Sequence, residues 1–161
     1  ELGAQVKRVV DSGLRVTHFD GHQHVHILPD VLAIVRELGV RYGIHAVRRP
    51  AEPLRLGAPV RMAQLMALRR FCELCDWSGW RTTDAFVGFL SGGTLDVAAA
   101  LRCLPDEGTT ELMCHPGEPD PDSPYARWGY AWARELNGLT NPAIRTLLEL
   151  RRIELVDFGA L

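Results

Sequence analysis

The chain has 161 residues, 47% of them hydrophobic and 24% charged, and its 18 basic and 20 acidic residues give a formal net charge of −2. This length and apolar content predict a globular fold with one sizeable core and exclude a disordered protein. The near-neutral charge argues against nucleic acid as a partner, and the apolar runs are too short for a transmembrane segment. With no visible secretory signal and too few cysteines for a disulfide scaffold, we expect a cytoplasmic location.

Helix and strand patterns alternate along the chain. Helices are predicted over residues 1–12, 29–38, 60–75, 94–104, 125–136 and 141–151. Strands are predicted over 15–19, 44–47, 110–114 and 153–158, residues 86–90 fit a strand or a loop, and 48–59 form a Pro- and Gly-rich loop. This alternation predicts an α/β fold with mainly parallel strands. Since a closed (β/α)-barrel takes ~250 residues, the chain is either a smaller open domain or the C-terminal portion of a barrel.

Histidines are concentrated between the first predicted strand and the helix that follows it. The cluster contains His18, His22, His24 and His26, with Asp20 among them. In an extended segment residues two apart share a face, so we expect these side chains to project to one side near the end of the strand, with regularity broken at Gly21. Imidazole is a common metal ligand, and the pattern therefore indicates metal binding or catalysis, with only one or two histidines on the metal. The spacing does not identify the metal.

A second signal is His115, which follows the predicted strand over 110–114 and precedes a Pro-Gly turn. A histidine titrates near neutral pH and suits general acid–base catalysis, although a turn histidine without a role fits this motif equally well. Cys114 is expected to point the other way, into the core.

Three further features favour structural interpretations. Tyr125, Trp128, Trp132 and Leu136 recur at helical spacing, which favours a core-facing helix over sugar stacking. The acidic segment with Glu118, Asp120 and Asp122 is interpreted as solvated turn residues rather than a lid. The four cysteines do not complete a zinc-ligand spacing, so we interpret them as buried thiols.

The segment 17–26 followed by Pro29, together with the segment 111–117, resembles the YdjC-like carbohydrate deacetylases. Residues 46–53 and 84–93 are similar to the branch of that family associated with hopanoid biosynthesis. The resemblance covers essentially the whole chain. It implies a single domain over 1–161 that is the C-terminal portion of a (β/α)-barrel-like domain of the glycoside hydrolase/deacetylase type.

The resemblance also implies an activity. Members of the family remove the acetyl group from N-acetylated amino sugars with a divalent metal ion, for which we expect Mg²⁺ before Zn²⁺. Two of the family's metal ligands stand in upstream motifs that are absent here, and the third corresponds to His22. Because one ligand cannot hold a hydrolytic metal, and because the chain starts with Glu1 rather than Met, we expect it to be an inactive fragment of a longer enzyme.

The resemblance assigns roles to individual residues. His22 is the expected metal ligand and His115 the expected proton donor to the leaving amine. Asp20, His24, His26 and Arg48 are expected to bind substrate or to support the metal ligand. The expected substrate is an N-acetylated sugar or glycolipid, such as an N-acetylglucosaminyl hopanoid. The sequence does not determine the oligomeric state, for which a homodimer is one option.

Two alternatives remain at this point. One is a different metal-dependent hydrolase of the amidohydrolase type, which also uses a His-x-His pair at a strand end. The other is a non-catalytic module that binds metal or sugar. An upstream Asp-Asp-Phe-Gly segment would favour the deacetylase, and a lack of acetate release would favour the binding module.

Overall fold

The protein is described by a computed structural model that covers residues 1–54 and 57–161. The chain forms two compact units. The first contains Glu1–Ala51, Met66–Thr83 and Val156–Leu161, and the second contains Glu52–Leu65 and Asp84–Leu155. In residues 1–54 and 57–161, we find no helix of the length and hydropathy needed to cross a membrane.

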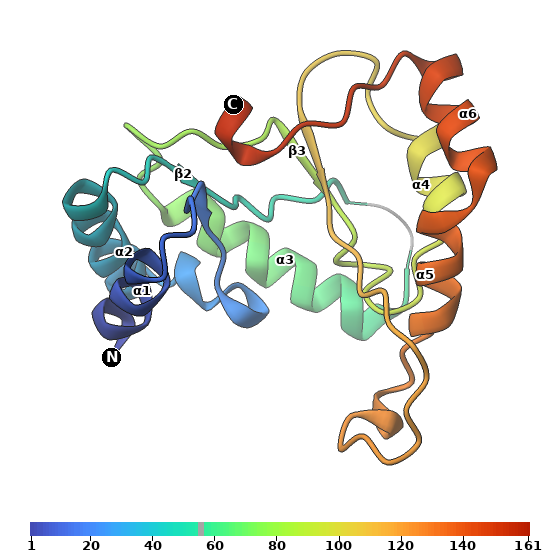
Figure 1. Cartoon of the computed structure of the whole chain (residues 1–161), viewed down its shortest axis with the longest axis horizontal. Helices are drawn as coiled ribbons and strands as arrows, with labels where there is room; N and C mark the ends of the chain where they lie inside the picture. Colours follow the sequence, from blue (N-terminus) through green and yellow to red (C-terminus); the bar gives the residue numbers. More distant parts are fainter. Residues whose placement is uncertain (55–56) are drawn as a thin grey trace. The chain divides into compact units, whose positions relative to one another are not determined.

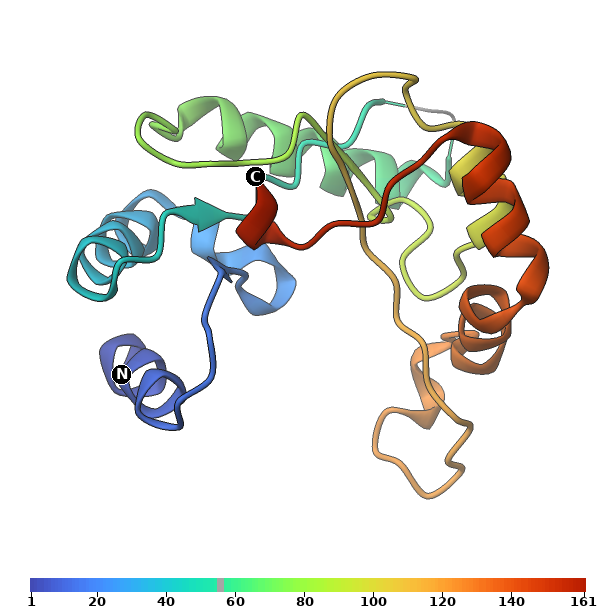
Figure 2. The ribbon, with the colours of Figure 1, turned by 45° about the horizontal axis from the view of Figure 1, so that its top comes forward.

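The first unit is built around one β–α–β motif. It contains α1 (Leu2–Asp11), β1 (His18–Phe19), the 3₁₀ segment η1 (His22–Ile27), α2 (Pro29–Tyr42), β2 (Ala46–Val47), the end of α3 (Pro59–Leu74) and η3 (Phe158–Ala160). Strands β1 and β2 pair in parallel, with His18 opposite Ala46 and Phe19 opposite Val47. Figures 1 and 2 both show α1 beside α2, which crosses over between the two strands.

Helix α2 shows how local sequence sets an element. Pro29 stands in its first turn, where the missing N–H is not needed. Gly43 ends the helix in the left-handed conformation at φ 70°. The helix thus extends to Tyr42, four residues beyond its predicted end. The buried face consists of Leu32, Val35, Leu38 and Gly39. A Cβ at Gly39 would lie 2.7 Å from the Ile44 carbonyl oxygen, so the helix approaches the following chain closely.

The second unit pairs another two parallel strands and contains the first part of α3 and three further helices. It contains β3 (Ala85–Val87), α4 (Val97–Arg102), β4 (Thr110–Leu112), the 3₁₀ turn η2 (Ala126–Trp128), α5 (Trp132–Thr140) and α6 (Pro142–Arg151). The register of β3 and β4 pairs Phe86 with Glu111. The core of this unit gathers Val87, Leu95, Val97, Ala100 and Leu101, with Leu112, Cys114, Ile144 and Leu147 packed against it. Helix α6 lies alongside α4 in Figures 1 and 2.

The predicted α/β class with parallel strands is confirmed. Of residues 86–90, which fitted a strand or a loop, only 86 and 87 lie in a strand, β3, and 88–90 do not. The predicted strand over 153–158 is wrong. Residues 153–157 belong to no helix or strand, and a 3₁₀ turn follows at Phe158–Ala160. The reason is a set of side-chain contacts: the Phe158 ring stacks on the His18 imidazole with centroids 4.0 Å apart, and Asp157 accepts a hydrogen bond from the backbone N–H of Gly159.

The predicted helix over 125–136 is wrong at its beginning. Residues 126–128 form a 3₁₀ turn, Gly129 has a φ of 71°, and α5 starts only at Trp132. A glycine in the left-handed region breaks the helical repeat that the aromatic spacing suggested. The predicted loop over 48–59 holds for the described residues up to the start of α3 at Pro59, while residues 55 and 56 lie outside them.

Candidate functional site

The histidine cluster is not an extended segment. After β1 the chain turns, and residues 20–26, here called the histidine turn, contain two non-glycine residues with positive φ, Gln23 at 50° and His24 at 61°. Each such residue costs about 1–2 kcal/mol of backbone strain. The side chains therefore do not share one face: His22 is exposed, whereas His24 and His26 are 6% and 2% exposed. The expectation of a shared face was wrong because the turn curls back on itself.

His26 holds the turn together. Its Nδ1 accepts a hydrogen bond from the backbone N–H of Gly21 at 3.0 Å, and its Nε2 donates to the Arg48 carbonyl oxygen at 2.8 Å. With one nitrogen accepting and the other donating, the ring is a neutral Nε2–H tautomer. Burial lowers the pKa of His26, which favours the same neutral form. Since both nitrogens are engaged, His26 is placed to support the turn rather than to bind a ligand.

Asp20 and Arg48 tie the turn to the end of β2. Their side chains form an ion pair at 2.7 Å, and the Arg48 side chain is only 15% exposed. The Arg48 backbone N–H donates to the Phe19 carbonyl oxygen at 2.9 Å, which continues the β1–β2 pairing. His24 contacts the His26 ring edge-on, with centroids 6.3 Å apart. The structure thus brings Asp20, His24, His26 and Arg48 together around the histidine turn, with His22 exposed at the start of η1.

His18 has a different surrounding from the rest of the cluster. Its ring is stacked on Phe158, and its Nδ1 lies 3.0 Å from the Thr17 hydroxyl oxygen. Burial is the largest influence on the His18 imidazole and lowers its pKa. Within the first unit, this histidine therefore packs the C-terminal turn η3 against β1.

In the second unit, His115 follows β4 and is held through its backbone. Its N–H donates to Oε2 of Glu135, and the N–H of Leu95 donates to the other oxygen, Oε1, at 2.9 Å. Glu135 is completely buried in α5. One carboxylate therefore joins the chain after β4 to the chain before α4. Hydrogen bonds to a buried carboxylate are among the stronger ones in proteins.

A second buried carboxylate acts in the same way. Glu52 is 3% exposed, and its Oε2 accepts hydrogen bonds from the N–H groups of Phe89 at 2.7 Å and Leu90 at 3.0 Å. Neither glutamate was assigned a role from the sequence. For Glu135 the sequence did contain a signal of burial. This charged residue stands three residues after Trp132 and four before Leu139, and therefore on the apolar face of its helix.

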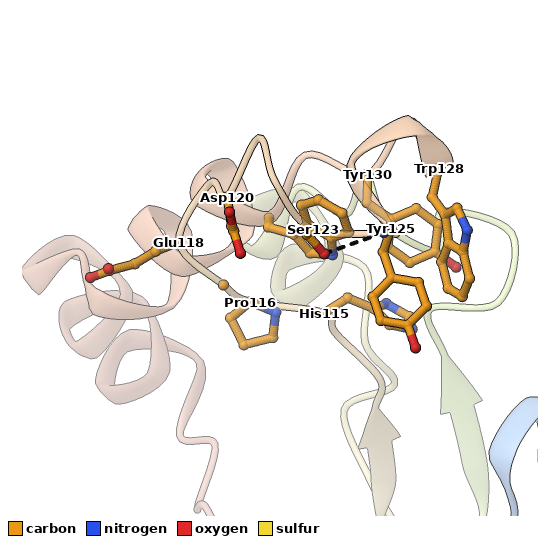
Figure 3. A pocket seen from close by; sticks show the side chains of 10 residues that line it. His115, Pro116, Glu118, Asp120, Ser123, Tyr125, Trp128 and Tyr130 are labelled. Carbon is orange, nitrogen blue, oxygen red and sulfur yellow. Dashed lines mark hydrogen bonds between the residues drawn. The ribbon is translucent and has the colours of Figure 1, made fainter.

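His115 opens onto a pocket of about 300 Å³ (Figure 3). Its lining consists of His115, Pro116, Gly117, Glu118, Asp120, Ser123, Tyr125, Trp128, Tyr130 and Trp132. The arrows in Figure 3 point from the strands toward the pocket, which lies at their carboxyl ends, where sites of α/β folds are usually built. The His115 ring meets the edge of Tyr130 with centroids 5.1 Å apart. Its Nδ1 is buried and has no hydrogen-bond partner among the described residues.

The aromatic residues of this loop are not the core-facing helix stripe that their spacing favoured. Tyr125 is 52% exposed and Trp128 is 50% exposed. The acidic segment was interpreted as solvated turn residues, and Glu118 and Asp120 are indeed exposed but also line the pocket. The loop therefore presents aromatic and acidic side chains around His115.

All four cysteines are free thiols. The prediction that they are buried holds only for Cys72, and Cys103 is exposed. Burial raises the pKa of Cys72 to about 11, and the Cys75 thiol donates to the Ile27 carbonyl oxygen at 3.0 Å. Cys114 packs against the core of the second unit, as predicted. A thiol with a raised pKa is a poor nucleophile and a poor metal ligand at neutral pH.

Residues 1–54 and 57–161 contain no group of three or more His, Cys, Asp or Glu side chains arranged to hold a metal ion. Of the residues assigned to the site, His22 is exposed at the end of β1 in the first unit, and His115 follows β4 in the second. The described residues by themselves therefore do not form a complete metal centre.

Comparison with known proteins identifies the family. The sequence model of the YdjC-like protein family matches residues 1–150. This chain belongs to the YdjC-like family. Among other members, it is 35% identical to a carbohydrate deacetylase of Mus musculus, with 96% of this chain and 59% of the relative aligned. It is 31% identical to a carbohydrate deacetylase of Brevibacillus brevis, with 100% and 60% aligned.

A chitooligosaccharide deacetylase of Enterobacter is 29% identical, with 98% of this chain and 58% of the relative aligned. The YdjC-like chain thus spans about three fifths of the length of these relatives. A crystal structure from Enterococcus faecalis V583, of a protein whose suggested role is cellobiose-phosphate cleavage, matches 98% of this chain and 57% of its own. Its TM-score is 0.60 at 20% identity, which shows a shared fold.

Proposed function

We propose that the complete protein is a cytoplasmic hydrolase that removes the acetyl group from an N-acetylated amino sugar. Relatives that align with 96–100% of this chain are named carbohydrate or chitooligosaccharide deacetylases. The observation that carries the proposal is the placement of His115, which follows β4 and opens onto a pocket lined with exposed aromatic rings. Membership of the YdjC-like family favours this function over an amidohydrolase. The similarity of 46–53 and 84–93 to the hopanoid branch makes an N-acetylglucosaminyl lipid one candidate substrate, and the relative named as a chitooligosaccharide deacetylase makes an N-acetylated sugar chain the other.

We assign the proton transfer to His115. In deacetylation, water adds to the amide carbon, the carbon–nitrogen bond breaks, and the nitrogen must gain a proton before it leaves as a free amine beside acetate. An imidazole that lines the pocket is suited to supply this proton. The Glu135 carboxylate holds the His115 backbone, and the Tyr130 ring limits the positions that the imidazole can take.

We assign His22 to a divalent metal ion, Mg²⁺ before Zn²⁺, whose other ligands come from outside these 161 residues. The structure around His22 supports this assignment. His22 is exposed directly after β1, whereas His26, Asp20 and Arg48 hold the histidine turn in shape. Asp20, His24, His26 and Arg48 thereby act as positioning residues for His22. A ligand on a restrained turn needs less reordering when the metal binds.

The proposal is tested by acetate release from N-acetylated amino sugars by the full-length protein. We expect His115→Ala to reduce kcat about 10²- to 10⁴-fold, the usual contribution of a general acid. His22→Ala and removal of metal by a chelator should both abolish turnover, and added Mg²⁺ should restore only the unmutated protein. Exposed His45, outside both proposed sites, is the matched control, and His45→Ala should retain the normal rate.

Near-normal rates in both His22→Ala and His115→Ala would refute the assignment of these residues. If the unmutated protein released no acetate from any N-acetyl sugar yet bound such sugars, the binding module would replace the enzyme as the function.

A further inference from the structure

The loop that carries the pocket has a defined shape. The N–H of Gly117 donates to the Trp132 carbonyl oxygen at 3.3 Å and joins the two ends of the loop. Tyr130 packs against Gly93, where an added Cβ would lie 2.4 Å from the ring, and the Ala131 N–H donates to the Gly93 carbonyl oxygen. In Figures 1 and 2 the loop extends away from α5. The aromatic side chains are therefore carried on a loop anchored at its base.

The aromatic rings of the loop contact one another. Ring centroids are 4.7 Å apart for Tyr125 and Trp128, and 5.7 Å apart for Trp128 and Tyr130, both in edge-to-face orientation. In this geometry one ring covers its neighbour only with an edge, which leaves ring faces open. Since Tyr125 and Trp128 each stay about half exposed, the loop presents apolar ring surface to solvent. An exposed aromatic surface inside a pocket is typical of a ligand site.

Charge adds a second property to the pocket. The ten lining residues include the carboxylates of Glu118 and Asp120 but no lysine or arginine. Both acidic residues are exposed, and Figure 3 shows them on the same loop as the aromatic side chains. Aromatic faces attract cations, and carboxylates do so as well. The preferred ligand should therefore combine a flat apolar face with a positive charge.

We propose that this pocket binds a sugar ring carrying a free amino group, as part of an amino-sugar chain in which that unit has already lost its acetyl group. The inference rests on the proposed function, which generates such a unit. The apolar face of the ring would stack on Trp128, and its ammonium group would lie near Asp120. Because His115 lines the same pocket, the unit would sit beside the one whose acetyl group is removed. The protein would thus favour chains that are already partly deacetylated.

The test is calorimetric titration of the full-length protein with a glucosamine tetramer, at a pH where the amines are protonated. Cellotetraose, which has hydroxyl groups in place of the amines, is the neutral comparison. We expect the glucosamine tetramer to bind about tenfold more tightly, the range expected for a cation at aromatic and acidic groups. Added salt should weaken the binding of the glucosamine tetramer and leave that of cellotetraose unchanged.

Two variants locate the binding. Trp128→Ala should weaken the glucosamine tetramer about tenfold, and Phe71→Ala, which removes a 40% exposed aromatic ring outside the pocket, should not. Asp120→Asn should weaken it several-fold. The asparagine retains the oxygen that accepts the Asp122 N–H at 3.0 Å, so the loop should keep its shape. Glu107→Gln, at an exposed position outside the pocket, is its control.

Equal affinity for the two tetramers, or unchanged binding in Trp128→Ala, would overturn the inference. Its failure is separate from failure of the proposed function, because binding is measured without acetate release. A protein that releases acetate but does not discriminate between the tetramers refutes only the inference. A protein that binds the glucosamine tetramer through Trp128 and Asp120 but releases no acetate refutes only the deacetylase function.

Discussion

At the scale of single residues, the buried glutamates show how much one side chain can organise. Glu135 is completely buried, and each of its oxygens accepts a backbone N–H, one from Leu95 and one from His115. These donors lie 40 and 20 residues away along the chain. The carboxylate therefore couples the position of His115 to the core of the second unit.

Replacing Glu135 should reduce the stability of the fold. Glu135→Gln keeps one acceptor oxygen but turns an NH₂ group toward a backbone N–H, and we expect it to lower the free energy of unfolding by about 1–3 kcal/mol. Glu149→Gln on α6, where the side chain is 72% exposed, is the control and should change it by less than about 0.5 kcal/mol. Urea unfolding measures the free energy of unfolding of both variants. Equal effects would mean that the bonds of Glu135 do not stabilise the fold.

At the scale of elements, the histidine turn depends on close packing at Gly21. A Cβ at this position would lie 2.9 Å from both the backbone nitrogen and Nδ1 of His26. The turn between β1 and α2 can therefore reach its compact form only with glycine there. His26 then closes it against the end of β2.

Gly21→Ala should displace the turn and lower the free energy of unfolding by about 1–3 kcal/mol, because the added methyl group meets backbone atoms. Gly3→Ala is a matched control in α1, where the new Cβ would make an ordinary contact of 3.6 Å with Leu38. There we expect no loss, or a gain of up to about 1 kcal/mol, since alanine favours a helix. Thermal unfolding compares the two, and a turn that accepts alanine without loss would show that it can relax.

At the scale of the whole molecule, the half-buried His18 and the buried His26 predict how stability depends on pH. Burial lowers the pKa of both His18 and His26, so the unfolded chain takes up protons at a higher pH than the folded protein does. Their contribution to stability is therefore complete above the unfolded pKa of about 6.5 and is lost as pH falls through the lower folded values. We expect the free energy of unfolding to decrease below pH ~6.5.

The variant His18→Phe tests whether His18 contributes to this pH dependence of stability. Phenylalanine keeps a ring to stack on Phe158 and removes one titrating group, so the loss of stability on acidification should become smaller. Urea unfolding at a series of pH values measures the slope for both proteins. His45→Phe, at an exposed position, should leave the slope unchanged. An identical slope in His18→Phe would assign the pH dependence to other groups.

The sequence alone determined the α/β class, the approximate positions of most helices, the resemblance to the YdjC-like family and the placement of His22 and His115 just after strands. These follow from hydrophobic periodicity and from Pro and Gly signals, which act over a few neighbouring residues. A local pattern could also mislead, as the aromatic spacing over 125–136 did when Gly129 broke the helix.

Tertiary structure alone decided which histidines are buried, that Glu135 holds His115, that Trp128 faces a pocket, and that the chain after Ile153 packs as a turn instead of a strand. Each of these depends on a partner far away in sequence, such as Arg48 for His26 at a separation of 22 residues. Such pairs form only when the strands and helices have packed, because burial of a polar group is stable only where a partner meets it.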